Sequence, residues 1–211
     1  MKKPLLLALV LAFSALTQSP ASALPAELTG PARVQALTLA STALNQSKAV
    51  KGRFTQIAPD GRASQGAFYL QRPGKLRFEY DPPATLTIIT DGALLSVADR
   101  AMKTDERYPL RTTPLYFVLK RDVNLETDGK VTRVAREGDA IYVTVRDRTG
   151  KADGSITLIF DAPSKELRAW RVVDGQGQLT QVVLAQTQSV ATLDPALFKL
   201  KPAPSPPGSH R

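Results

Sequence analysis

The side chains that most often carry out chemistry in proteins are scarce in this chain. It contains no cysteine, and its single histidine, His210, is the last residue but one. A thiol nucleophile, a zinc–thiolate site and a Ser-His-Asp triad within a folded domain are therefore excluded, and a histidine metal site nearly so. We expect no metal and no other cofactor.

Four aspartates remain as candidates for acid–base chemistry. A hydrolase could use two carboxylates as its catalytic pair, and the candidates are Asp81, Asp91, Asp99 and Asp105. Each is explained more simply as a turn or surface residue, and no recognisable motif pairs two of them. The sequence therefore predicts no catalytic residue and a protein that is not an enzyme.

One arginine occupies an unexpected place. Residues 66–83 read GAFYLQRPGKLRFEYDPP, an alternating strand pattern interrupted at residues 72–74. Because successive side chains of a strand point to opposite faces, Arg72 shares the face of Phe68 and Leu70. An unpaired guanidinium is unfavourable on an apolar face. Two interpretations stay open: Arg72 hydrogen-bonds to the free carbonyls at the end of a short helix, or it extends to water beyond the turn.

The rest of the pattern is dominated by short strands. Alternating apolar residues begin near Phe54 and recur in about nine to eleven runs, separated by Asp-Gly, Pro-Gly and similar turn signals. This arrangement indicates antiparallel hairpins. So many strands in one domain predict a large curved sheet or a barrel, because a long open sheet would leave exposed edges.

Two segments break the strand pattern and are predicted to be helices. Residues 29–47 begin with a possible N-cap at Thr29 and carry apolar residues from Val34 onward at helical spacing, which indicates a face packed on a sheet. Residues 113–119, TPLYFVL, are apolar nearly all round, so this short helix is unsuited to an open surface. It is either a core helix that plugs one end of the barrel or a lid over an apolar cavity.

The N-terminal residues are typical of a secretory signal peptide. MKKPLLLALVLAFSALTQSPASA has a basic start, an apolar run and a small-x-small ending, which predicts cleavage after Ala23. The apolar run of about twelve residues is shorter than the roughly 20 needed to span a bilayer. Residues 24–200 are predicted to form one domain, and the proline-rich residues 201–211 are predicted to be disordered.

The basic composition does not indicate nucleic-acid binding. The formal net charge is +9, and removal of Lys2 and Lys3 with the signal peptide leaves 9 − 2 = +7. The basic residues are scattered, mostly beside acidic ones, and form no stripe with regularly spaced aromatic residues. A mixed-charge, solvated surface is the better interpretation.

The order and spacing of several segments resemble the bacterial periplasmic outer-membrane lipoprotein carrier family, LolA. The resemblance covers the signal peptide, the first helix, FTQIAPDGRASQGAFYLQRPGKLRFEYDPPATLTIITDG, TTPLYFVLKRD and the closing LDPALFKLKP. It implies a mainly β fold, an incomplete (half-open) antiparallel β-barrel of about 11 strands with a lid of short helices. It also implies a monomeric carrier that takes the acyl chains of lipoproteins from an inner-membrane ABC-type exporter to an outer-membrane receptor.

The resemblance and the strand parity together define a candidate acyl-chain site. The resemblance implies that Arg72, the arginine of an Arg-Pro pair, is a latch that holds the lid shut in the empty carrier. Where well-known members have aromatic residues at the positions of Leu76 and Phe78, only Phe78 is aromatic here. Shared parity predicts that the cavity is formed by Phe68, Leu70, Leu76, Phe78, Tyr80, Leu86 and Ile88. The predicted lid residues are Pro114, Leu115, Phe117 and Val118.

Two other functions of the same fold stay open. The first is a sensor that binds lipoproteins or lipids as a signal, and the second is a carrier for a different lipid. A sensor of this kind usually has a further domain, for which residues 24–200 are too few. The carrier is therefore favoured, and its expected location is the periplasm.

Overall fold

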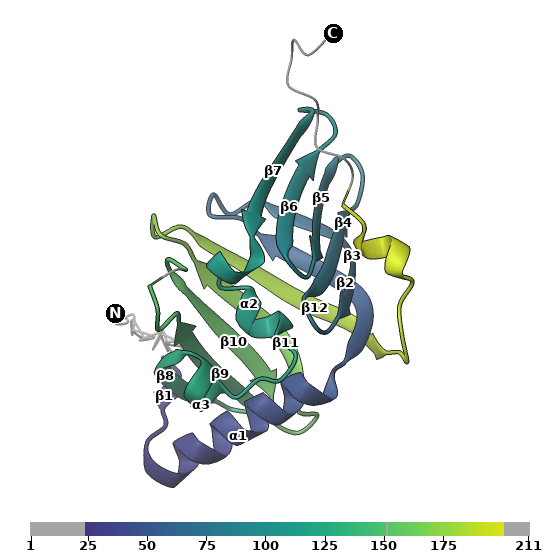
Figure 1. Cartoon of the computed structure of the whole chain (residues 1–211). Coiled ribbons are helices and arrows are strands. Elements are labelled where there is room, and N and C mark those ends of the chain that lie inside the picture. Colours follow the sequence, from purple (N-terminus) through teal and green to yellow (C-terminus); the bar gives the residue numbers. More distant parts are fainter. Residues whose placement is uncertain (1–23, 151, 201–211) are drawn as a thin grey trace, which may run out of the picture.

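The computed structural model describes residues 24–150 and 152–200 (Figure 1). Its first half contains β1 (Ala26–Glu27), α1 (Gly30–Gln46), β2 (Ala49–Ile57), β3 (Ala63–Gln71), β4 (Lys75–Tyr80), β5 (Leu86–Asp91), β6 (Leu94–Asp99) and β7 (Thr104–Pro109). Its second half contains η1 (Leu110–Thr112), α2 (Tyr116–Leu119), α3 (Leu125–Asp128), β8 (Lys130–Glu137), β9 (Ala140–Arg146), β10 (Ser155–Asp161), β11 (Glu166–Val173), β12 (Leu179–Ser189) and η2 (Pro195–Phe198). The predicted signal peptide and the predicted C-terminal tail with His210 lie outside the described residues.

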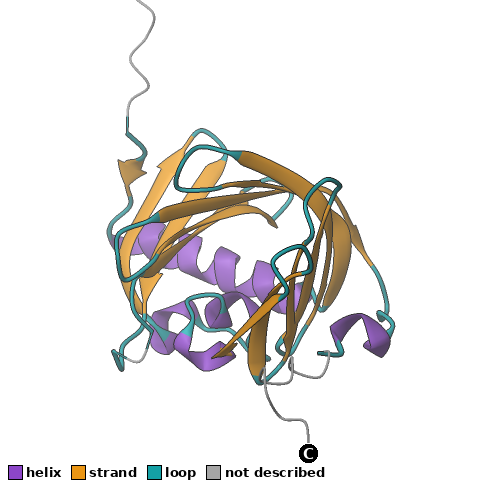
Figure 2. Cartoon of the chain, turned by 90° about the horizontal axis from the view of Figure 1, so that it is seen from above, coloured by secondary structure: helices purple, strands orange, loops and turns teal. Residues whose placement is uncertain are grey.

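The twelve strands form one antiparallel sheet in the order β1-β8-β9-β10-β11-β12-β2-β3-β4-β5-β6-β7. β1 and β7 stand at the two ends of this order, so the sheet formed by the described residues is open. Figure 2 shows the strands as an incomplete ring with helices on its open side. The prediction of a mainly β, half-open antiparallel barrel with short helices is confirmed.

The sequence pattern did not predict strands β1 and β8. β1 has two residues, which is too short for a pattern. In β8 the pairing with β9 shifts register between Val131 and Arg133. An extra residue of this kind breaks the two-residue alternation on which strand prediction depends. Its inward residue Val134 is nevertheless fully buried.

Helix α1 packs on the concave side of the sheet against β8, β9 and β11 (Figure 1). Thr29 stands at the N-cap position with an extended backbone, but its side chain forms no capping hydrogen bond. The assignment of Val34 to the packed face was wrong, because this residue is 51% exposed. The buried face consists of Ala36, Leu37, Ala40, Ala43 and Leu44. Within the described residues, no helix is long and apolar enough to cross a membrane.

The core lies between the concave face of the sheet and the helices. At its centre the ring of Phe78 lies 4.4 Å from that of Phe54 and 6.0 Å from that of Trp170, centroid to centroid. A separate small cluster on the other face of the sheet holds η2, where Phe198 packs with Ala49. The helices near the concave face and η2 therefore cover opposite faces.

Candidate functional site

Arg72 lies in the turn between β3 and β4 and connects the ends of two helices. Its Nε donates a hydrogen bond to the carbonyl of Val118 at 2.8 Å, and its Nη1 donates to the carbonyl of Ser47. Val118 belongs to α2, and Ser47 is the C-cap residue of α1. Carbonyls at the C-terminal ends of helices lack intrahelical partners and carry partial negative charge. The guanidinium therefore meets acceptors suited to a cation.

Burial lowers the pKa of Arg72 well below its usual range, to about 10. The guanidinium is still protonated at neutral pH, so all of its N–H donors are present. The lowered pKa reflects a desolvation cost, which the two carbonyl bonds offset. The half-buried Arg72 side chain is thus held by contacts that exist only while both helix ends are in place.

The backbone of the same turn also hydrogen-bonds to α2 and to the residue that follows the C-cap of α1. The Arg72 N–H donates to the carbonyl of Lys48 at 2.8 Å, and the Gly74 N–H donates to the carbonyl of Leu119 at 2.7 Å. The fully buried Thr90 of β5 in turn donates its hydroxyl to the Gly74 carbonyl at 2.7 Å. The turn is therefore fixed to the sheet and supplies a rigid base for the helix ends.

The residues predicted to form the hollow face all belong to the central core. The buried ones are Phe68, Leu70, Leu76, Phe78 and Tyr80, and the half-buried ones are Leu86 and Ile88. Of the predicted lid residues, Phe117 and Val118 are buried, and Pro114 and Leu115 are half-buried. In this structure these side chains pack on one another. Their role in binding a ligand remains a prediction.

Tyr80 brings a polar group to this face, and that group has a partner. Its hydroxyl donates to Oε1 of Gln56 at 2.6 Å. Burial raises the pKa of Tyr80 to about 12, so the hydroxyl remains protonated at neutral pH. The donor is satisfied, and the apolar character of the face is preserved.

Several core residues were missed by sequence reasoning. Phe54 lies on β2 and Trp170 on β11, and both ring systems contact Phe78 from distant parts of the chain. Phe54 stands at the start of an alternating run, and this pattern could have predicted that its side chain is part of the core. The alternation around Trp170 is irregular, because β11 pairs with β10 through a register shift after Ile159.

The open space nearest to these residues is a cavity of about 190 Å³. It lies between the last turn of α1 and strands β11 and β12, and it reaches Phe68, Leu70 and Arg72. A larger groove of about 560 Å³ is present on the outer face of β4 to β7, where its lining includes Arg77 and Ser96. Since β4 alternates, Arg77 points away from the face that carries Phe78, and of the predicted site residues only Tyr80 and Leu86 reach this groove.

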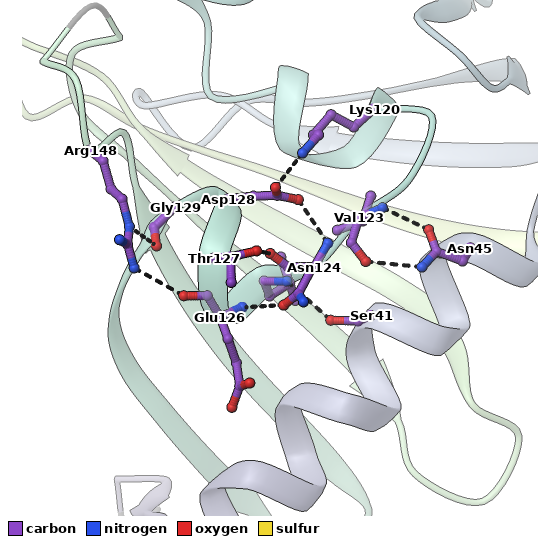
Figure 3. Close-up of polar contacts among 11 residues, drawn as sticks. Ser41, Asn45, Lys120, Val123, Asn124, Glu126, Thr127, Asp128, Gly129 and Arg148 are labelled. Atoms are coloured by element: carbon purple, nitrogen blue, oxygen red, sulfur yellow. Dashed lines mark hydrogen bonds and ion pairs between the residues drawn. The ribbon is translucent and has the colours of Figure 1, made fainter.

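The chain that follows α2 is attached to α1 by side chains (Figure 3). Asn45 donates from Nδ2 to the carbonyl of Val123 at 2.9 Å and accepts from the Val123 N–H at 2.8 Å. One turn earlier, Ser41 Oγ accepts from the Leu125 N–H at 3.1 Å. Lys120 and Asp128 form an ion pair across the same segment. We call residues 113–129 the lid segment; its second half is fixed to α1 as shown in Figure 3.

Replacing Asn45 with alanine is expected to loosen this attachment. The change removes two hydrogen bonds and leaves both backbone groups of Val123 without a side-chain partner, so unfolding should become easier by about 1 to 3 kcal/mol. Denaturant unfolding and amide hydrogen exchange measure the effect, with Thr42→Ala on the exposed face of α1 as the control. Unchanged exchange of the Val123 amide in Asn45→Ala would contradict the assignment.

The four aspartates considered for acid–base chemistry serve structure. Asp81 pairs with Arg53, and Asp91 accepts from the Ala93 N–H at 2.8 Å. A hydrogen bond from the Thr85 hydroxyl lowers the pKa of Asp99.

The remaining aspartate, Asp105, lies next to Arg107, whose hydrogen bond lowers the Asp105 pKa. Asp99 and Asp105 are therefore held in the ionised form, whereas a general acid at neutral pH needs a raised pKa.

The fold and the site define a class: a half-open β-barrel whose apolar concave face is covered by helices that one half-buried arginine ties to the sheet. The family profile described as "Outer membrane lipoprotein carrier protein LolA" matches residues 45–201. The chain belongs to this family, and the resemblance found in the sequence is confirmed.

Curated relatives agree with the family assignment. An outer-membrane lipoprotein carrier protein of Methylococcus capsulatus is 28% identical over 168 residues, covering 75% of this chain and 80% of the relative. A protein of the same name from Chromobacterium violaceum is 26% identical over 190 residues, covering 86% and 91%. One from Legionella pneumophila strain Corby is 26% identical over 203 residues, covering 94% and 93%. These matches support a lipoprotein carrier role.

Proposed function

We propose that this protein is a periplasmic, non-enzymatic carrier that binds the acyl chains of lipoproteins on its concave face, among Phe68, Leu70, Phe78 and their neighbours. The observation that carries the proposal is Arg72, a half-buried cation hydrogen-bonded to the ends of two helices over an apolar face. This arrangement can close without a ligand and can open when one enters. The family membership and the names of the relatives support the same role.

The closed state must open before it can hold a lipid. Sites for drug-sized ligands occupy about 300 to 1,000 Å³, whereas the cavity beside Arg72 measures about 190 Å³. The rings of the concave face fill the remaining space. Acyl chains therefore have to displace the lid segment and separate the core side chains from one another.

A closed state that competes with the ligand also makes release possible. Each buried methylene contributes about 0.8 kcal/mol, so a chain of roughly 14 methylenes offers about 11 kcal/mol and three chains over 30. The practical limit of noncovalent affinity lies near 18 to 21 kcal/mol. A carrier must lower its net affinity, and the packing and hydrogen bonds of the closed state do so because loading disrupts them.

The remaining parts of the proposal concern location and partners. Residues 1–23 would direct export and be removed after Ala23, and residues 24–200 would form the carrier domain. The carrier would receive lipoproteins from an inner-membrane ABC-type exporter and deliver them to an outer-membrane receptor. It would act as a monomer, and nucleic acid is no part of this function.

Titration with a synthetic triacylated cysteine lipopeptide tests the proposal. We expect saturable binding to the purified protein and none for the same peptide without its acyl chains. The buried Trp170, which contacts Phe78, should report the opening of the core as a change in fluorescence. Equal binding of the acylated and deacylated peptides, or binding of neither, would reject the proposed function.

A further inference from the structure

The cavity beside Arg72 has an apolar interior and a polar rim. Its deep wall is formed by Leu44, Val50, Phe68, Leu70 and Leu184, each at most 8% exposed. Its rim carries the exposed residues Gln46, Ser164, Lys165 and Ser189. An apolar cavity of about 150 Å³ in another protein takes up benzene or xenon. A cavity of about 190 Å³ therefore has room for the end of one hydrocarbon chain.

The sheet beside the cavity is interrupted by a bulge. The pairing of β12 with β2 shifts register between Ala185 and Gln188, and Gln186 has a positive φ of 50°. Opposite the bulge stands Gly52, where a Cβ would lie 2.7 Å from the Ala185 oxygen and 2.8 Å from the Phe68 ring. Bulges of this kind are frequent beside functional sites, where they redirect side chains. Here the bulge adjoins Leu184 and Thr187, which line the cavity.

The cavity touches only one of the two helix ends that Arg72 holds. Arg72 and Ser47 both line it, whereas Val118 does not. The bond from Arg72 to the Ser47 carbonyl therefore lies at the cavity wall, and the bond to Val118 lies behind it. A ligand that enters the cavity therefore contacts the end of α1 before it contacts α2.

We propose that this cavity admits the end of a single hydrocarbon chain into the closed protein, before the lid segment moves. The advancing chain separates the Ser47 carbonyl from Arg72 and displaces the last turn of α1. Asn45 belongs to that turn and is bonded to Val123, so the displacement is transmitted to the chain that follows α2. The inference rests on the proposed function, because it names the route by which the ligand of that function enters.

The first test uses the closed protein and n-hexane as the probe. Methyl NMR spectra should show saturable shifts at Leu44, Leu70 and Leu184, while the methyls of Val118 and Leu119 stay unchanged. An Ala43→Leu variant should lose these shifts, because Ala43 lines the cavity and a larger side chain fills it. Absence of the shifts in the wild type, or shifts centred on Val118, would overturn the inference whether or not lipopeptide binds.

The second test measures how fast the triacylated lipopeptide associates. Ala43→Leu should slow association on the order of tenfold, equivalent to about 1.4 kcal/mol. The control is Ala32→Leu, which adds the same side chain at an exposed position of α1. Equal rates for the two variants would remove the cavity from the route and leave the proposed function intact. Hexane binding without any lipopeptide binding would reject the proposed function and retain the cavity as a site for hydrocarbon chains.

Discussion

Arg72→Leu is expected to accept lipoprotein and to release it on the order of tenfold or more too slowly. In the closed state the Arg72 side chain bonds to Ser47 and Val118, and each charged hydrogen bond contributes about 1.5 to 3 kcal/mol. Loading breaks these bonds. Removing them therefore favours the loaded state by a similar amount, and about 1.4 kcal/mol corresponds to a factor of ten.

Separate measurements of loading and release decide this prediction. Loading is followed with the triacylated lipopeptide, and release is followed as transfer to lipid vesicles or to a receptor. Arg62→Leu is the matched control, since Arg62 is exposed in the turn between β2 and β3. Arg72→Lys keeps the charge but cannot place two N–H groups as a guanidinium does, so its release should be intermediate. Unchanged release from Arg72→Leu, or a defect confined to loading, would refute the role of the arginine.

Phe78→Asp is expected to destabilise the closed fold by several kcal/mol and to prevent acyl-chain binding. Phe78 is 3% exposed and packs against the rings of Phe54 and Trp170. Loss of a buried phenylalanine costs about 3 to 5 kcal/mol, and an ionised carboxylate in the same place adds a further desolvation cost. Phe78→Leu should fold and still bind, because it keeps an apolar side chain of similar reach.

The loss of stability in Phe78→Asp should depend on pH. Burial raises the pKa of a carboxyl group in the folded state above its value of about 3.9 in the unfolded chain. The unfolded state therefore loses its proton first, and the folded state is weakened progressively as pH rises above that value. Denaturant unfolding at about pH 4 and about pH 7 should show a larger difference from Phe78→Leu at the higher pH. The same difference at both values, or retained lipopeptide binding by folded Phe78→Asp, would contradict the burial of the introduced carboxylate in the acyl-chain site.

Strand parity predicted the concave face well because it is a local property. Phe68 and Leu70 on β3, and Leu76, Phe78 and Tyr80 on β4, alternate strictly and all point into the core. Strand parity predicts the face to which a side chain points, but it does not predict which residues of other strands that side chain contacts. The contacts of Phe78 with Phe54 and Trp170 depend on how β2 and β11 are brought together, which the sequence pattern does not encode.

Of the two hydrogen-bond acceptors of Arg72, one fits an interpretation of the sequence and the other could not be predicted from it. An acceptor at the end of a short helix was among the interpretations of the sequence, and Val118 fits it. The second acceptor, Ser47, was not foreseen, because it depends on the register of β2 and β3, in which Ala49 pairs with Gln71 and brings the end of α1 beside Arg72. The cavity beside them was likewise hidden, since it depends on a bulge in β12 for which the alternation of that strand gave no signal.

Native mass spectrometry of the protein recovered from the periplasm tests the central claim most directly. The Arg72→Leu variant, which should retain its ligand, is the suitable form to isolate. We predict a complex of residues 24–211 with one acylated lipoprotein, and loss of that complex when Phe78→Asp is added. Recovery of Arg72→Leu bound to free phospholipid, or without any ligand, would contradict the account.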